Sequence, residues 1–151
     1  MLIAVCTDDP MVEDICKAAA MSDPDVFGDR WFRVYADVIP DLGAQEDLFI
    51  VAHGAAIGDE DLPIIGSKHN AFYLSARDLR ANLQGFPSGY AGNVYIYACQ
   101  SALAGQAERS FVQNYLADMT PSYPGISVYG QTGSPGGPLP LPTDDSWVRA
   151  I

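Results

Sequence analysis

The stretch NVYIYACQS, residues 93–101, decides the fold because an apolar strand carries a cysteine to the point where a helix is expected to begin. A second apolar run, residues 48–52 (LFIVA), ends in the same way on His53 and Gly54. Short, continuous apolar runs are typical of strands buried on both faces of a parallel sheet. The carboxyl ends of such strands meet at one edge, so we expect the Cys99 thiol and the His53 imidazole to face each other. A cysteine nucleophile and its base have this layout.

Strand and helix patterns alternate along the rest of the chain. Further strands are expected over residues 2–6, 31–38, 71–74 and 126–130, and helices over about 10–20, 76–84 and 104–119. The stretch from 54 to 70 has little periodicity, so we expect a long loop beside His53. The alternation predicts an α/β domain with a mostly parallel sheet of about five strands, covered on both faces.

The end of the chain has a different composition. Residues 133–142 are rich in glycine and proline. Proline removes a backbone donor, and both residues weaken strand pairing. We therefore divide the sequence into a domain over 1–132 and a C-terminal tail over 133–151. The tail is expected to pack on the same domain without sheet pairing over 133–142, and Trp147 is expected to be its only strong anchor.

Composition and charge narrow the classes of function. The 151 residues contain no apolar run near the ~20 that a membrane span needs, and the start lacks the basic region of a signal peptide. We therefore expect a cytoplasmic protein. Residues 1–61 carry 14 acidic and three basic side chains, whereas the acids and bases of 62–151 balance. The excess of negative charge in residues 1–61 repels phosphate backbones and anionic lipid, so neither nucleic acid nor a membrane is expected as partner.

The three cysteines differ in context. Cys6 and Cys16 stand in apolar strand and helix patterns, where a free cysteine behaves as a small core residue. Cys99 stands at a strand end. The cysteines and histidines lack the spacing of a zinc site, so neither a metal nor a cofactor is expected.

The two strand ends together resemble the caspase-like cysteine peptidases, a superfamily that includes caspases, metacaspases, peptidases related to clostripain and gingipain, and self-processing toxin domains. These proteins share a strand ending in His-Gly and, about 50 residues later, one ending in Ala-Cys. Here 46 residues separate His53 from Cys99. The caspase signature Q-A-C-[RQG]-G matches over residues 98–100 and departs at Tyr97 and Ser101. The chain therefore resembles the broad superfamily and not a true caspase.

The resemblance implies a caspase-like three-layer sandwich and an endopeptidase that acts on a protein or peptide, in a setting such as a bacterial effector or toxin. Cys99 would attack the peptide carbonyl, and His53 would protonate the leaving amine. The backbone N–H groups of Gly54 and Cys99 would bind the oxyanion. Some members bind Lys or Arg through an acidic residue in this region, which makes Asp8 and Asp9 candidate substrate-binding residues.

Each candidate site residue also has a purely structural interpretation. Cys99 and His53 are also compatible with a buried thiol and a structural histidine, and Asp8 and Asp9 with the cap of the first helix. His69 is a second candidate base, but no strand positions it. The main alternative function is a catalytically silent caspase-like module that binds a partner through the acidic loop at 59–61. A flavodoxin-like nucleotide site is disfavoured because no glycine-rich phosphate loop follows the first strand.

Overall fold

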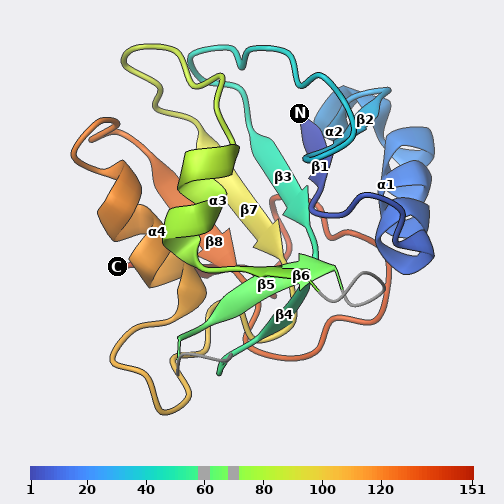
Figure 1. The fold of residues 1–151 in the computed structure, drawn as a ribbon. Coiled ribbons are helices and arrows are strands. Elements are labelled where there is room, and N and C mark those ends of the chain that lie inside the picture. The colour runs from blue at the N-terminus through green and yellow to red at the C-terminus, as the bar shows by residue number, and fades with distance from the viewer. Residues whose placement is uncertain (58–61, 68–71) are drawn as a thin grey trace.

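A six-stranded sheet forms the centre of the computed structural model, which describes residues 1–57, 62–67 and 72–151 (Figure 1). Its strand order is β2-β1-β3-β7-β8-β9. The first five of these are parallel, and β9 is antiparallel at the edge. Their bounds are β1 Leu2–Ala4, β2 Trp31–Arg33, β3 Leu48–Val51, β7 Asn93–Tyr97, β8 Ser127–Gly130 and β9 Val148–Arg149. The predicted α/β class with a mostly parallel sheet is confirmed, with one edge strand more than expected.

A second, antiparallel sheet occupies part of the stretch that was expected to be a long loop. It consists of β4 (His53–Ala55), β5 (Ile64–Ser67) and β6 (Phe72–Leu74), in the order β4-β5-β6. The loop prediction is therefore wrong for the described part of this stretch. Glycines at 54 and 66 obscured the strand pattern, because a strand glycine contributes no side chain to the periodicity.

Four helices complete the described structure: α1 (Pro10–Ser22), α2 (Pro24–Phe27), α3 (Ala76–Asn82) and α4 (Phe111–Met119). The expected start of α3 is confirmed, since Ser75 and Asp78 form a reciprocal capping box. Among the described residues, no helix has the length and apolarity required to cross a bilayer.

Two predicted boundaries are wrong for local reasons. The helix expected from 104 begins at Phe111, because Ser110 and Gln113 form a capping box that fixes its first turn there. The strand expected over 31–38 ends at Arg33, where the chain turns. Asp37 stabilises that turn, since its carboxylate accepts hydrogen bonds from the Arg33 backbone amide and guanidinium.

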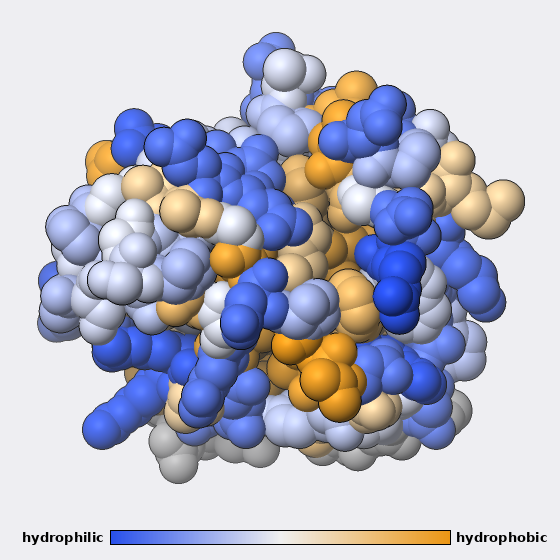
Figure 2. All heavy atoms as spheres, turned by 90° about the horizontal axis from the view of Figure 1, so that it is seen from above, coloured by the Kyte–Doolittle hydropathy of each residue, from blue (hydrophilic) through white to orange (hydrophobic). Residues whose placement is uncertain are grey.

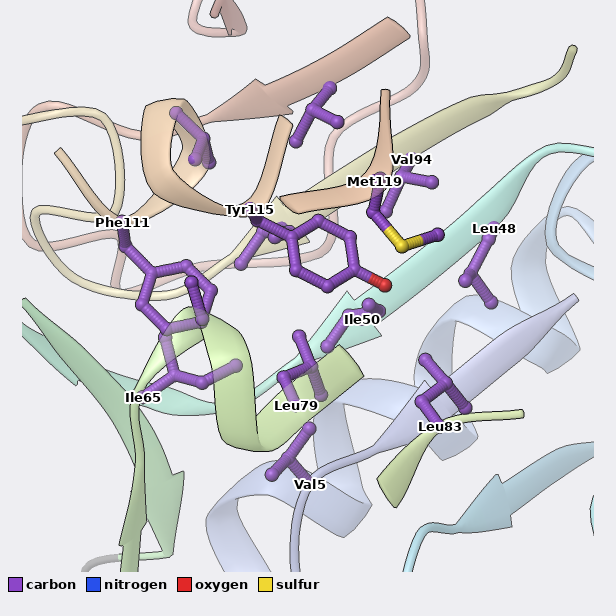
Figure 3. Close-up of a cluster of buried hydrophobic side chains, with 14 of the residues drawn as sticks. Val5, Leu48, Ile50, Ile65, Leu79, Leu83, Val94, Phe111, Tyr115 and Met119 are labelled. Carbon is purple, nitrogen blue, oxygen red and sulfur yellow. The ribbon is translucent and has the colours of Figure 1, made fainter. Parts of the chain in front are cut away.

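Side chains alternate between the two faces of the main sheet and form two cores. On one face, α3, α4 and β5 cover the sheet, and Ile50 and Val94 pack with Leu79, Phe111 and Tyr115 (Figure 3). The other face packs against α1, α2 and the C-terminal tail. Its core residues include Phe27 of α2, Phe49 and Tyr95 of the sheet, Cys16 of α1 and Leu139 of the tail.

The C-terminal tail is held at several points. Leu139 and Ala150 are each 6% exposed, and the ring of Trp147 lies 5.1 Å from that of Tyr95. The tail ends in β9, where Val148 pairs with Gly130 of β8. The expectation that Trp147 would be the only strong anchor is therefore wrong. Leu139 belongs to the core that also contains residues of the sheet, α1 and α2, so burial holds it despite the neighbouring prolines.

We expect Leu139→Ala to lower the free energy of unfolding by about 2–4 kcal/mol, because it empties a buried position in this second core. Leu141→Ala is the matched control, since Leu141 is 42% exposed and its truncation is expected to change stability by less than about 0.5 kcal/mol. Urea denaturation of both variants measures the difference. Equal small losses would show that the tail only drapes over the sheet.

Candidate active site

Strands β3 and β7 bring His53 and Cys99 to the same edge of the sheet. They are parallel neighbours with Val51 opposite Tyr97, and each candidate residue follows its strand end by two positions. One further hydrogen bond, from the Ala52 amide to the Tyr97 carbonyl at 3.1 Å, holds together the segments that follow the two strands. His53 and Cys99 line one small cavity. The structure therefore brings together the two residues that the strand ends predict.

Gly54 lies directly against the backbone of Cys99. A Cβ atom at Gly54 would lie 2.5 Å from the Cys99 carbonyl oxygen and 3.1 Å from its nitrogen, which is closer than side chains tolerate. Glycine is thus required here for close approach. The two residues assigned to the oxyanion hole are in contact through their backbones, and the role of their N–H groups stays a prediction.

Asp9 holds the imidazole of His53, a contact that the sequence did not reveal. Asp9 Oδ2 lies 3.1 Å from His53 Nε2, and the aspartate side chain is 4% exposed. The same oxygen accepts a hydrogen bond from Ser67 Oγ, and Oδ1 accepts from the amides of Met11 and Val12. These donors stabilise a buried carboxylate. With Nε2 donating its hydrogen to Asp9, Nδ1 of His53 is the nitrogen that can act as base.

The other acidic candidates are placed differently. Asp8 is exposed and accepts a hydrogen bond from Thr7 Oγ1 at 3.3 Å. Among the described residues that line the cavity beside Cys99, neither Asp8 nor Asp9 is present. Asp9 does cap α1, which was the plainer interpretation, while the binding of a basic substrate side chain by these aspartates stays a prediction. His69 and the acidic stretch 59–61 lie outside the described residues.

Cys99 does not stand at a helix N-terminus as expected. The chain turns at Gln100, whose φ of 57° is left-handed and incompatible with a continuing helix. The Gln100 amide donates to the Gly133 carbonyl at 2.8 Å, and its side-chain oxygen accepts from the Ala56 amide at 3.2 Å. A helix dipole therefore cannot be invoked to activate Cys99.

Ser101 stabilises the chain just after the cysteine, a role that no sequence pattern predicts. Its side chain is buried, donates to the Ile96 carbonyl at 3.0 Å and accepts from the Gln131 amide at 2.9 Å. Its own carbonyl accepts from the Val112 amide in the first turn of α4. One serine thus connects β7, the end of β8 and α4, and so stabilises the turn that carries Cys99.

The three cysteines separate clearly by environment. Cys6 and Cys16 are fully buried, and burial raises the pKa of both thiols. Cys99 is half-buried. No cluster of His, Cys, Asp and Glu that could hold a metal ion is found within residues 1–57, 62–67 and 72–151.

A larger hollow of about 330 Å³ lies at the opposite, amino end of the strands, between α3 and the end of α4. Figure 2 looks onto this end of the molecule and shows apolar side chains gathered between hydrophilic ones. The hollow is lined by Leu83, Phe86 and Met119, together with Arg80 and other residues. Because the cysteine and the histidine are at the other end, size alone does not identify the site of chemistry.

Comparisons of the chain with protein-family models, curated proteins and solved structures find no match. The resemblance to caspase-like peptidases therefore rests on the residues of the two strand ends. The geometry described above is the basis for assigning a function.

We expect a thiol reagent such as iodoacetamide to modify one cysteine per native chain at neutral pH, at Cys99. A raised pKa means less thiolate at any given pH, so Cys6 and Cys16 are protected by protonation as well as by burial. Mass spectrometry of digested protein locates the adduct, and Cys99→Ala is the control that should remain unmodified. Modification of Cys6 or Cys16 at a comparable rate would contradict the described packing.

Proposed function

We propose that the protein is a caspase-like cysteine endopeptidase in which Cys99 is the nucleophile and His53 the general acid and base. The observation that carries the proposal is the meeting of the two residues at one cavity, with a buried carboxylate 3.1 Å from Nε2 of the imidazole. A nucleophile, a base and a group that orients the base form the general arrangement for acyl transfer.

In the proposed reaction, the Cys99 thiolate attacks the carbonyl carbon of a peptide bond, and the C=O electron pair moves to the oxygen. The imidazolium of His53 gives its Nδ1 proton to the amine nitrogen as the C–N bond breaks. A thioester remains on Cys99. His53 then takes a proton from water, whose oxygen attacks the thioester, and the carboxylic acid leaves as the C–S bond breaks.

Asp9 is a positioning residue in this scheme because it acts through His53. Its carboxylate fixes the ring orientation and the tautomer, and its negative charge stabilises the imidazolium that the reaction requires. Its burial strengthens this effect, since charges interact more strongly where water is excluded. The helix cap and the Ser67 hydroxyl hold the carboxylate in place.

The arrangement of layers supports the caspase-like assignment. The histidine follows the third strand of the chain and the cysteine follows the neighbouring parallel strand, with cores on both faces of the sheet. Catalytic groups at the carboxyl ends of parallel strands are the rule in open α/β sheets.

Cys99→Ala and His53→Ala are each expected to lower peptide cleavage by about 10³-fold or more, because each removes a group that the chemistry uses directly. The circular dichroism spectrum should not change, since neither side chain is part of the two cores. Cleavage is measured on a pool of quenched fluorescent peptides that differ at the residue before the cut. Wild-type turnover by Cys99→Ala would refute the mechanism, and the absence of cleavage in every variant whose Cys99 reacts with iodoacetamide would favour the silent module.

Asp9→Asn is expected to lower kcat by about 100-fold or more while KM changes little, because the neutral amide no longer orients and stabilises the imidazolium. Asparagine caps helices as well as aspartate does, so α1 should remain stable. Asp8→Asn, which changes the exposed neighbour, is the matched control. If Asp9→Asn impairs only peptides with Lys or Arg before the cut, then Asp9 binds substrate instead.

A further inference from the structure

Residues 133–137 of the tail lie beside the carboxyl ends of β3 and β7. The Gly133 carbonyl accepts a hydrogen bond from the Gln100 amide at 2.8 Å, next to Cys99. Four residues later, the Tyr97 hydroxyl donates to the Gly137 carbonyl at 2.7 Å. Pro135 lies between these two contacts and lines the same cavity as His53 and Cys99. The segment is thus held across the candidate active site at both of its ends.

The described residues leave little free space at this place. The cavity beside Cys99 measures about 20 Å³. A single water molecule needs roughly 10–15 Å³ by the same kind of measure, so the space admits about one water and no side chain. A substrate side chain can therefore enter this cavity only if one of its walls moves, and Pro135 is the wall that the irregular tail supplies.

The walls of the cavity are apolar apart from the two reactive residues. They consist of Met11, Val12 and Ile15 of α1, Ala52, Tyr97 and Pro135. Such walls favour a small apolar side chain and penalise a charge that would lose its hydration. Pro135 is an occupant of this kind, supplied by the chain itself.

The segment is built to move without unfolding the sheet. Gly133, Gly136 and Gly137 have no neighbouring atom within 4 Å of a Cβ position, so no packed side chain holds the segment at these three residues, and glycine backbones adopt other conformations at little steric cost. The fixed points lie outside the segment, at the Gln131 carbonyl bonded to the Ala102 amide and at buried Leu139. Opening therefore breaks the hydrogen bond between Gln100 and Gly133 and the two between the Tyr97 hydroxyl and Gly137, and it exposes one proline.

We propose that residues 133–137 occupy the substrate cleft as an internal blocker, with Pro135 in the place of a small apolar side chain of the substrate. The consequence for activity rests on the proposed peptidase function, whereas the blocking itself concerns only access to Cys99. The substrate preference differs from the basic one that Asp8 and Asp9 suggest. It follows from the side chains that line the cavity.

The test compares Pro135→Gly with Pro138→Gly in the full chain. Both variants add the same backbone freedom, but Pro138 is exposed and does not line the cavity. Its carbonyl, 3.4 Å from the Tyr97 hydroxyl, is kept by the substitution, so the difference between the variants reports the Pro135 side chain. The measured quantity is the rate at which iodoacetamide alkylates Cys99 at neutral pH. We expect Pro135→Gly to react at least fivefold faster than both wild type and Pro138→Gly.

Tyr97→Phe provides a second, independent variant because it removes only the hydroxyl that holds Gly137. The hydroxyl donates to the Gly137 carbonyl at 2.7 Å and accepts from the Gly137 amide at 3.3 Å. Loss of one such hydrogen bond changes a two-state population about fivefold, so alkylation of Cys99 should accelerate by about fivefold or more. Equal alkylation rates in wild type, Pro135→Gly and Tyr97→Phe would overturn the proposal.

Short peptides then test whether the cavity prefers an apolar side chain. In Pro135→Gly, short peptides carrying proline or alanine should protect Cys99 from alkylation at lower concentration than matched peptides carrying arginine. Better protection by arginine would overturn the assignment of an apolar occupant. Faster alkylation without peptide cleavage in any variant would support the blocker and count against the peptidase. Cleavage that is equally fast in wild type and Pro135→Gly would support the peptidase and overturn the blocker.

Discussion

The parallel register between β3 and β7 sets where the reactive groups of this protein lie. Because Val51 stands opposite Tyr97, two residues of chain on each strand carry the imidazole and the thiol to one cavity. A slip of one residue would turn every side chain of a strand to the opposite face. The alternating residues of β3 belong to two different cores, and this burial strongly disfavours such a slip. The packing of the sheet and the geometry of the site thus depend on the same pairing.

Asp9 connects this edge to the first strand and helix. It follows β1, it starts α1 through two backbone amides, and it holds His53 beyond β3. One buried carboxylate therefore serves local helix formation and the candidate chemistry together. Asparagine can cap the helix but carries no negative charge. Asp9→Asn would therefore preserve the start of α1 and remove the charge that faces His53.

The sequence predicted the features that depend on local pattern. Continuous apolar runs indicated the parallel strands, and Ser75 with Asp78 indicated a helix start. What it missed depends on contacts between distant segments or on backbone conformation. Strand β4 forms only because β5 pairs with it, and a pairing partner cannot be read from a local pattern. Asp9 meets His53 because β1 lies beside β3. The chain turns after Cys99 because Gln100 has a left-handed φ. The helix of Phe111–Met119 was predicted to begin too early, because Ala104, Ala107 and Glu108 have high helix propensity although they lie before the Ser110 cap.

The short strand β9 has a consequence for how copies of this protein meet. It pairs with Tyr129 and Gly130 of β8 and is the outermost strand on that side of the sheet. Without it, β8 would present unpaired backbone donors and acceptors, which is the template for strand-to-strand association between molecules. The last residues of the described chain therefore shield the sheet from aggregation. A proteolytic cut that released them would change the colloidal behaviour of the protein as well as its stability.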